Sequence, residues 1–184
     1  MAFGDAAGEQ TAAERANVAR RYRRRRGEQL KTLAARAVDG EILAAGEFST
    51  VATEAIASIP GLGMVMLPLA RRRSRRVGLS PNIMLALTED TLHALTLDPA
   101  GLRRDETEIA EARAWPRSEV RAETDGKAFM RDKVLLHVPD AEEPITLYAP
   151  VLRTNPWSAE VVRLLGGDAP DPLDIGLTFA GDDE

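Results

Sequence analysis

Cysteine is absent from the 184-residue chain, which excludes disulfide bonds and thiolate metal sites. The absence is compatible with a reducing compartment. A long hydrophobic run is also missing, because the longest uncharged apolar stretch, 55–70, is interrupted by two prolines and two glycines. It is shorter than the roughly 20 residues that a membrane-spanning helix needs. The first ten residues lack the basic start and apolar centre of a signal peptide. We therefore expect a soluble, cytoplasmic protein.

Recognisable catalytic motifs are missing as well. There is no G-x-S-x-G elbow and no Walker-type loop, and the pair Gly61 and Gly63 lacks the third glycine of a dinucleotide turn. The two histidines, His93 and His137, each fall inside a predicted strand, and no further ligands accompany them in a metal-binding pattern. The sequence therefore favours a non-enzymatic protein without a cofactor or a metal.

Charge is unevenly distributed along the chain. Residues 1–80 carry 14 basic and 8 acidic residues, a net of +6, whereas residues 81–184 carry 10 and 21, a net of −11. A basic half of this kind can bind phosphates, a membrane surface, or the acidic half of the same protein.

The N-terminal part of the chain predicts one helical segment. Residues 1–10 are predicted to be disordered, and residues 11–40 to be helical, with an apolar stripe in the second half and a cationic band over 20–26. Gly27 is a candidate break in this helix. A nucleic-acid role for the cationic band is disfavoured, because only Tyr22 interleaves as an aromatic and the chain is acidic overall. A solvated helix face is the favoured interpretation.

Seven strands are predicted between residues 41 and 149, followed by one helix. The strand ranges are 41–53, 82–88, 91–97, 107–115, 118–124, 129–138 and 145–149, with Asp125-Gly126 as the best hairpin turn. Asn155 and Pro156 predict a helix start, and Trp157, Val161, Leu164 and Leu165 form one apolar stripe that should face the sheet. Phe48, Trp115 and Phe129 are predicted core residues. Residues 168–184 are predicted to be an acidic flexible tail.

This order of elements resembles the pleckstrin-homology-like (PH-like) domains, specifically bacterial ones of uncharacterised function. The segments that carry the resemblance are 82–95 (NIMLALTEDTLHAL), the Trp115-Pro116-Arg117 step with Glu119-Val120, and 155–165 (NPWSAEVVRLL). The resemblance implies a mostly β, α+β fold: a seven-stranded antiparallel barrel over 41–167, capped by the C-terminal helix and preceded by the N-terminal helix. The insertion 54–80 between the first two strands departs from a minimal member of the family.

The insertion holds the candidate binding residues. Five arginines in six positions suit the recognition of anions, and an apolar run before them suits contact with lipid. The anion, lipid or partner-binding candidates are Arg71, Arg72, Arg73, Arg75 and Arg76, and the membrane-contact candidates are Met64, Met66, Leu67 and Leu69. A plainer interpretation is that the apolar residues pack on the barrel and the arginines are solvated.

The resemblance implies binding, since domains of this fold bind phosphoinositides, peptides or other proteins. We expect a binding or scaffolding module that engages a protein partner. The first alternative is a peripheral membrane binder that uses residues 64–76 on anionic lipid. A further alternative is a small-ligand carrier or enzyme with a pocket in or beside the barrel. Nucleic acid is the least favoured partner.

Overall fold

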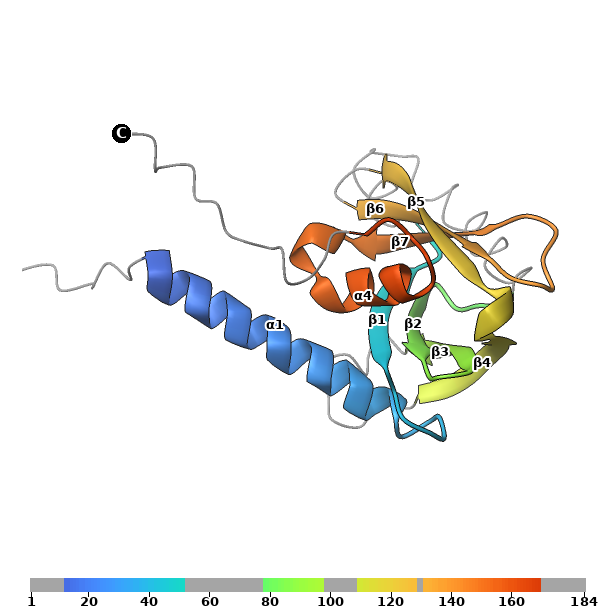
Figure 1. Cartoon of the computed structure of the whole chain (residues 1–184), viewed down its shortest axis with the longest axis horizontal. Coiled ribbons are helices and arrows are strands. Elements are labelled where there is room, and N and C mark those ends of the chain that lie inside the picture. The colour runs from blue at the N-terminus through green and yellow to red at the C-terminus, as the bar shows by residue number, and fades with distance from the viewer. Residues whose placement is uncertain (1–11, 52–77, 98–108, 129–130, 170–184) are drawn as a thin grey trace, which may run out of the picture.

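A computed structural model of the chain describes residues 12–51, 78–97, 109–128 and 131–169 (Figure 1). It has two α-helices and seven strands in these residues, in the order predicted from the sequence. The helices are α1 (Ala12–Ala34) and α4 (Pro156–Leu164), and two short 3-10 helices are η2 (Arg117–Glu119) and η3 (Leu152–Thr154). The strands are β1 (Ala44–Ser49), β2 (Asn82–Leu87), β3 (Thr91–Leu97), β4 (Ile109–Pro116), β5 (Arg121–Ala128), β6 (Arg131–His137) and β7 (Ile145–Pro150).

The strands form one antiparallel sheet in the order β4-β3-β2-β1-β7-β6-β5. The predicted α+β class is confirmed, but the predicted barrel is wrong, because β4 and β5 end the sheet and no ladder joins them within the described residues. The junction in the middle is narrow, since β1 meets β7 only where Ser49 lies opposite Tyr148. The sheet therefore consists of a four-stranded and a three-stranded part joined at one corner.

The main core fills the inner side of this sheet. Alternate residues of each strand face it, among them Phe48, Ile83 and Leu147, and α4 adds Val161 and Val162. The predicted core positions Phe48 and Trp115 are confirmed, with only 4% and 3% of their surfaces exposed. Burial of this apolar surface is the main source of the fold's stability.

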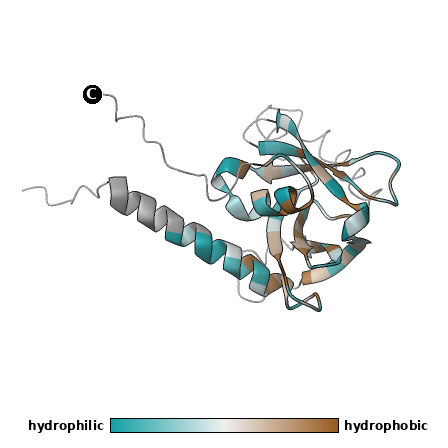
Figure 2. Cartoon of the chain, in the orientation of Figure 1, coloured by the Kyte–Doolittle hydropathy of each residue, from teal (hydrophilic) through white to brown (hydrophobic). Residues whose placement is uncertain are grey.

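A second, smaller apolar cluster lies on the outer side of the sheet. Leu30, Ala34 and Val38, in and just after the second half of α1, pack there with Met84 and Leu95. Strand β2 is consequently buried on both faces, with Leu85 in the inner cluster and Met84 in the outer one. In Figure 2 the strands next to α1 are largely brown, whereas the coloured part of α1 is mostly teal and turns brown at its C-terminal end.

Helix α4 lies directly on β1. Gly46 makes this close approach possible, because a Cβ atom there would come within 2.7 Å of the Cα atom of Ser158. The Ser158 hydroxyl donates a hydrogen bond of 3.1 Å to the Glu47 carbonyl. Pro156 occupies the first turn of α4 as predicted, although the Asn155 side chain makes no capping bond to the helix.

Three local predictions need correction. Gly27 does not break α1, because Trp157 packs over it and the helix continues to Ala34. Trp157 belongs to the outer cluster with α1 and not to the inner core. Asp125 and Gly126 do not form a hairpin turn; they lie inside β5 at a shift in register between Thr124 and Lys127, where Gly126 has φ +73°. A glycine with positive φ in an irregular strand pair is typical of a β-bulge.

Two residues of the predicted tail, Asp168 and Ala169, are described by the structure. Asp168 and Ala169 lie against the sheet: the Thr124 hydroxyl donates to the Asp168 carbonyl, and Ala169 packs on the inner core. The predicted disordered segment 1–10, Phe129 and most of the insertion lie outside the described residues.

Candidate functional site

The insertion residues singled out from the sequence lie outside the described residues. These are the five arginines Arg71, Arg72, Arg73, Arg75 and Arg76 and the apolar residues Met64, Met66, Leu67 and Leu69. The structure therefore neither brings them together nor separates them, and their proposed role stays a prediction.

The structure does describe the root of the insertion. The backbone N–H of Thr50 donates to the Pro81 carbonyl over 2.9 Å, and the Ser49 hydroxyl donates to the same carbonyl over 2.9 Å. Thr50 also reaches the Ser80 carbonyl with its hydroxyl, over 3.1 Å. The two chain segments that flank residues 52–77 are thus fastened together at one end of β1 and β2.

A different cationic surface is described in part on α1. Arg21, Arg24 and Arg25 are exposed, and Tyr22, which follows Arg21 in the sequence, has 67% of its surface exposed. Residues three and four apart share one side of a helix, so Arg21, Arg24 and Arg25 form one surface. We call these three arginines, together with Tyr22, the arginine face. None of the three arginines has an ion-pair partner within the part of the chain that the structure describes.

The arginine face directly precedes the residues of α1 that contact the sheet and α4. Figure 1 shows the N-terminal half of α1 standing clear of the sheet, while its C-terminal end packs against it. Arg26 forms an ion pair with Glu47 of β1, one residue after the face ends. Trp157 of α4 packs on Gly27. These contacts hold α1 in a fixed direction, so the arginine face is presented by an anchored helix.

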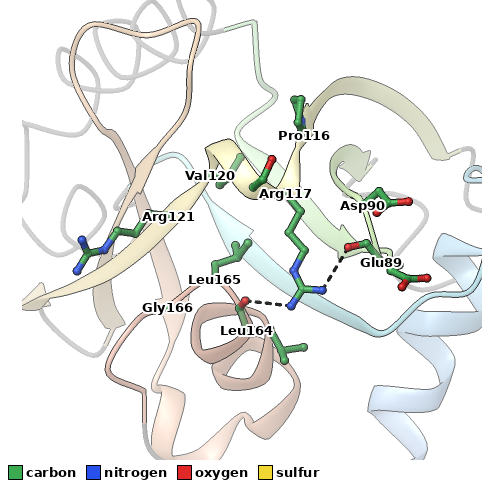
Figure 3. Close-up of a pocket in the computed structure, with 10 residues that line it drawn as sticks. Glu89, Asp90, Pro116, Arg117, Val120, Arg121, Leu164, Leu165 and Gly166 are labelled. Atoms are coloured by element: carbon green, nitrogen blue, oxygen red, sulfur yellow. Dashed lines mark hydrogen bonds between the residues drawn. The ribbon is translucent and has the colours of Figure 1, made fainter.

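A shallow groove of about 960 Å³ is a second candidate site. It lies between the β2–β3 turn, the η2 segment and the C-terminal end of α4 (Figure 3). Its walls combine Glu89 and Asp90 with Arg117 and the apolar side chains Val120 and Leu165. Sequence reasoning missed this groove, since its members are scattered over four elements and share no motif.

Arg117 crosses the groove and joins its two walls. Its guanidinium donates to the Glu89 carbonyl over 3.3 Å and to the Leu164 carbonyl over 3.4 Å, as the dashed lines of Figure 3 show. A guanidinium at the last turn of α4 satisfies a carbonyl that has no partner within the helix. The donors of Arg117 that point across the groove are therefore used by the fold, which favours a structural role for this residue.

The side chain of Asp140 connects the two parts of the sheet through contacts with β4. It lies in the β6–β7 connection, and its Oδ1 atom accepts a hydrogen bond of 2.7 Å from the indole N–H of Trp115. Its second oxygen forms an ion pair with Arg113. Side chains thus connect the two parts of the sheet, where a closed barrel would have a backbone ladder. The Asp140 carboxylate and the Arg113 guanidinium are both used in this connection.

The two histidines lie on different strands of the sheet, His93 on β3 with 14% of its side chain exposed and His137 on β6 with 43% exposed. His93 pairs with Glu111 on β4, and His137 pairs with Glu123 on β5 at 3.2 Å. No group of three or more His, Asp and Glu side chains capable of holding a metal ion occurs within the described ranges. None of the helices described is both long and apolar enough to cross a membrane.

Comparison with known proteins gives no family assignment. A scan against models of protein families finds no match, and a search of curated proteins finds no similar sequence. The structure itself is a seven-stranded antiparallel sheet with an N-terminal and a C-terminal helix.

Proposed function

We propose that the chain is a binding module that engages a protein partner through the arginine face of α1. The observation that carries this proposal is the exposure of Tyr22, 67%, beside three exposed arginines that lack ion-pair partners in the described part of the chain. Tyrosine and arginine are over-represented among the residues that dominate the energy of protein interfaces. Of the described residues, Tyr22 is the single large apolar side chain that is exposed.

The proposed partner surface is acidic. Guanidinium groups form two parallel hydrogen bonds with carboxylates, and Arg21 and Arg25, one helical turn apart, suit two carboxylates about 6 Å apart along a partner chain. The net charge of −5 disfavours nucleic acid, because the rest of the protein repels a polyanion.

Three features support a PH-like fold for this module: the sheet order, the lack of a described ladder between β4 and β5, and the helix after the last strand. A PH-like sheet has the same order of seven antiparallel strands followed by one helix, as the resemblance in the sequence implies. Fold alone does not assign a partner, so the fold supports binding in general and the arginine face supports the particular surface.

The proposal is tested with three matched baits in a lysate of the native host: the full chain, the variant R21S/R24S/R25S and the control K127S/R153S/R163S. Lys127, Arg153 and Arg163 are exposed and lie outside α1, so the control removes the same charge. We expect a partner that the full chain and the control capture and the α1 variant does not. With the purified partner, the α1 variant should bind at least about tenfold more weakly, a loss of about 1.4 kcal/mol.

Two results would contradict the proposal. Equal weakening by the control would show that net charge and not the arginine face is responsible. Loss of the captured partner after nuclease treatment would show that nucleic acid joins the two proteins.

A peripheral membrane role is the second candidate, because the bonds of Ser49 and Thr50 to Ser80 and Pro81 fasten the apolar and arginine-rich insertion at one end of the sheet. Liposome flotation with anionic lipid tests it. Basic residues near such a surface contribute about 1 kcal/mol each, so serine at Arg71, Arg72, Arg73, Arg75 and Arg76 should abolish flotation. Flotation unchanged by these substitutions would exclude membrane binding through the five arginines.

A further inference from the structure

The arginine face belongs to a helix whose positive charge is not balanced locally. Residues 12–34 carry eight basic and two acidic residues, a net of +6. Within the described residues the one ion pair of α1 joins Arg26 to Glu47. Exposed like charges on one helical turn repel each other, and an acidic ligand relieves that repulsion.

The same chain contains a segment of matching charge. Residues 170–184 contain five acidic residues and no lysine or arginine, a net of −5. The acidic residues fall into two groups, Asp171 and Asp174 near the start and Asp182, Asp183 and Glu184 near the end. Pro170 and Pro172 favour an extended chain at its beginning.

The structure places the start of this segment within reach of α1. Ala169, the residue before it, packs on the inner core beside α4. Helix α4 has nine residues, so it is about 14 Å long, and its first turn touches α1 where Trp157 packs on Gly27. Fifteen residues reach about 50 Å when extended, and as a flexible chain their typical end-to-end distance is about 20 Å.

We propose that the acidic segment 170–184 binds across the arginine face of α1 in the same chain. Carboxylates of the segment pair with Arg21, Arg24 and Arg25, which lack ion-pair partners in the described structure. Tethering gives such a segment a millimolar effective concentration, roughly, so weak individual pairs suffice for occupancy. The contact depends on charge and therefore weakens as salt is added.

The contact has a consequence that rests on the proposed function. An acidic partner of the arginine face must displace the segment, so the segment acts as an internal competitor. Removing the segment would then raise the affinity for that partner, whereas the contact itself exists without any partner.

The absence of cysteine allows a direct test on the full chain. A nitroxide is attached at Ala180→Cys, and amide signals of the ¹⁵N-labelled protein are recorded with the label oxidised and reduced. At a salt concentration of about 0.01 M, where charges act over roughly 30 Å, we expect the α1 amides of 21–25 to lose most of their intensity. At about 1 M salt, where the range is roughly 3 Å, the loss should disappear.

Matched variants separate this contact from general electrostatics. R21S/R24S/R25S should abolish the intensity loss in α1, whereas K127S/R153S/R163S should preserve it. Circular dichroism and the unchanged amide signals of β2 and β6 check that each variant is folded. No intensity loss at low salt, or an equal loss in both variants, would overturn the proposal.

A mixed sample identifies the chain that supplies the segment. Labelled ¹⁴N protein is combined with unlabelled ¹⁵N protein, and intensity loss in the ¹⁵N chain would show that a second copy supplies the segment, which overturns the intramolecular contact. Because no partner is present in these samples, failure of the contact leaves the partner experiment unaffected, and the converse also holds.

Discussion

Gly46 of β1 lies against the backbone of Ser158 in α4, at a distance that leaves no space for a side chain. The hydroxyl of Ser158 bonds to the next carbonyl of the same strand, over 3.1 Å. Helix α4 is therefore held to the central strand by backbone proximity as well as by apolar packing.

We expect Gly46→Ala to lower the free energy of unfolding by about 1–3 kcal/mol, because the added Cβ would meet the Cα atom of Ser158 at 2.7 Å and force α4 outward. Chemical denaturation measures the change. Gly27→Ala is the control: its Cβ would meet Trp157 at an ordinary 3.9 Å, and alanine in a helix should raise the stability by up to about 1 kcal/mol. Equal effects of the two substitutions would contradict the close approach at Gly46.

The Asp140 bridge gives a second prediction. Asp140→Ala should cost about 1–3 kcal/mol, because the indole N–H of the buried Trp115 would lose its acceptor. Glu142→Ala, at an exposed position in the same connection, should change the stability by less than about 0.5 kcal/mol. Indole ¹H–¹⁵N spectra give an independent readout, in which the Trp115 signal should shift and that of Trp157 should stay.

The ion pair between Arg26 and Glu47 anchors α1 to the sheet. Its side chains are 22% and 23% exposed, so we expect a coupling energy near the upper end of the range of about 0.2–1 kcal/mol found for accessible pairs. A double-mutant cycle of Arg26→Ala and Glu47→Ala measures it. A coupling energy of zero would mean that apolar packing alone holds the helix. In a separate measurement, hydrogen exchange should be faster in α1 than in β2.

Strand β2 should be sensitive to substitution on both of its faces. Met84→Ala and Leu85→Ala should each cost about 2–5 kcal/mol, because both side chains are fully buried, in the outer and inner clusters. Thr96→Ala on the neighbouring strand β3, at a partly exposed position, provides the comparison. A small effect at Met84 would show that α1 does not cover the outer face in solution.

Much of this fold could be predicted from the sequence, because its strands show local alternation and its helices show apolar stripes. The burial of Met84 could not, since it depends on the distant α1, and alternation in 82–88 indicated only one buried face. The open sheet was missed for a similar reason: the bridge from Asp140 to Trp115 replaces a ladder, and side-chain bridges leave no periodic signal.

The candidate site was predicted only in part. The cationic band over 20–26 was visible in the sequence, but a solvated face was favoured. The sequence could not show that Arg26 faces Glu47 while Arg21, Arg24 and Arg25 stay exposed. The groove around Arg117 depends on elements distant in sequence.

The position of α4 on β1 also orders events during synthesis. Strand β1 pairs with β2, which follows it after a long insertion, and with β7, the last strand in the sequence. Helix α4, which packs on β1, comes later still. A nascent chain that ends before residue 156 would lack the helix that covers Gly46 and contacts α1. The ribosome must therefore release nearly the entire domain before the middle of its sheet is covered, and until then this surface is available to chaperones.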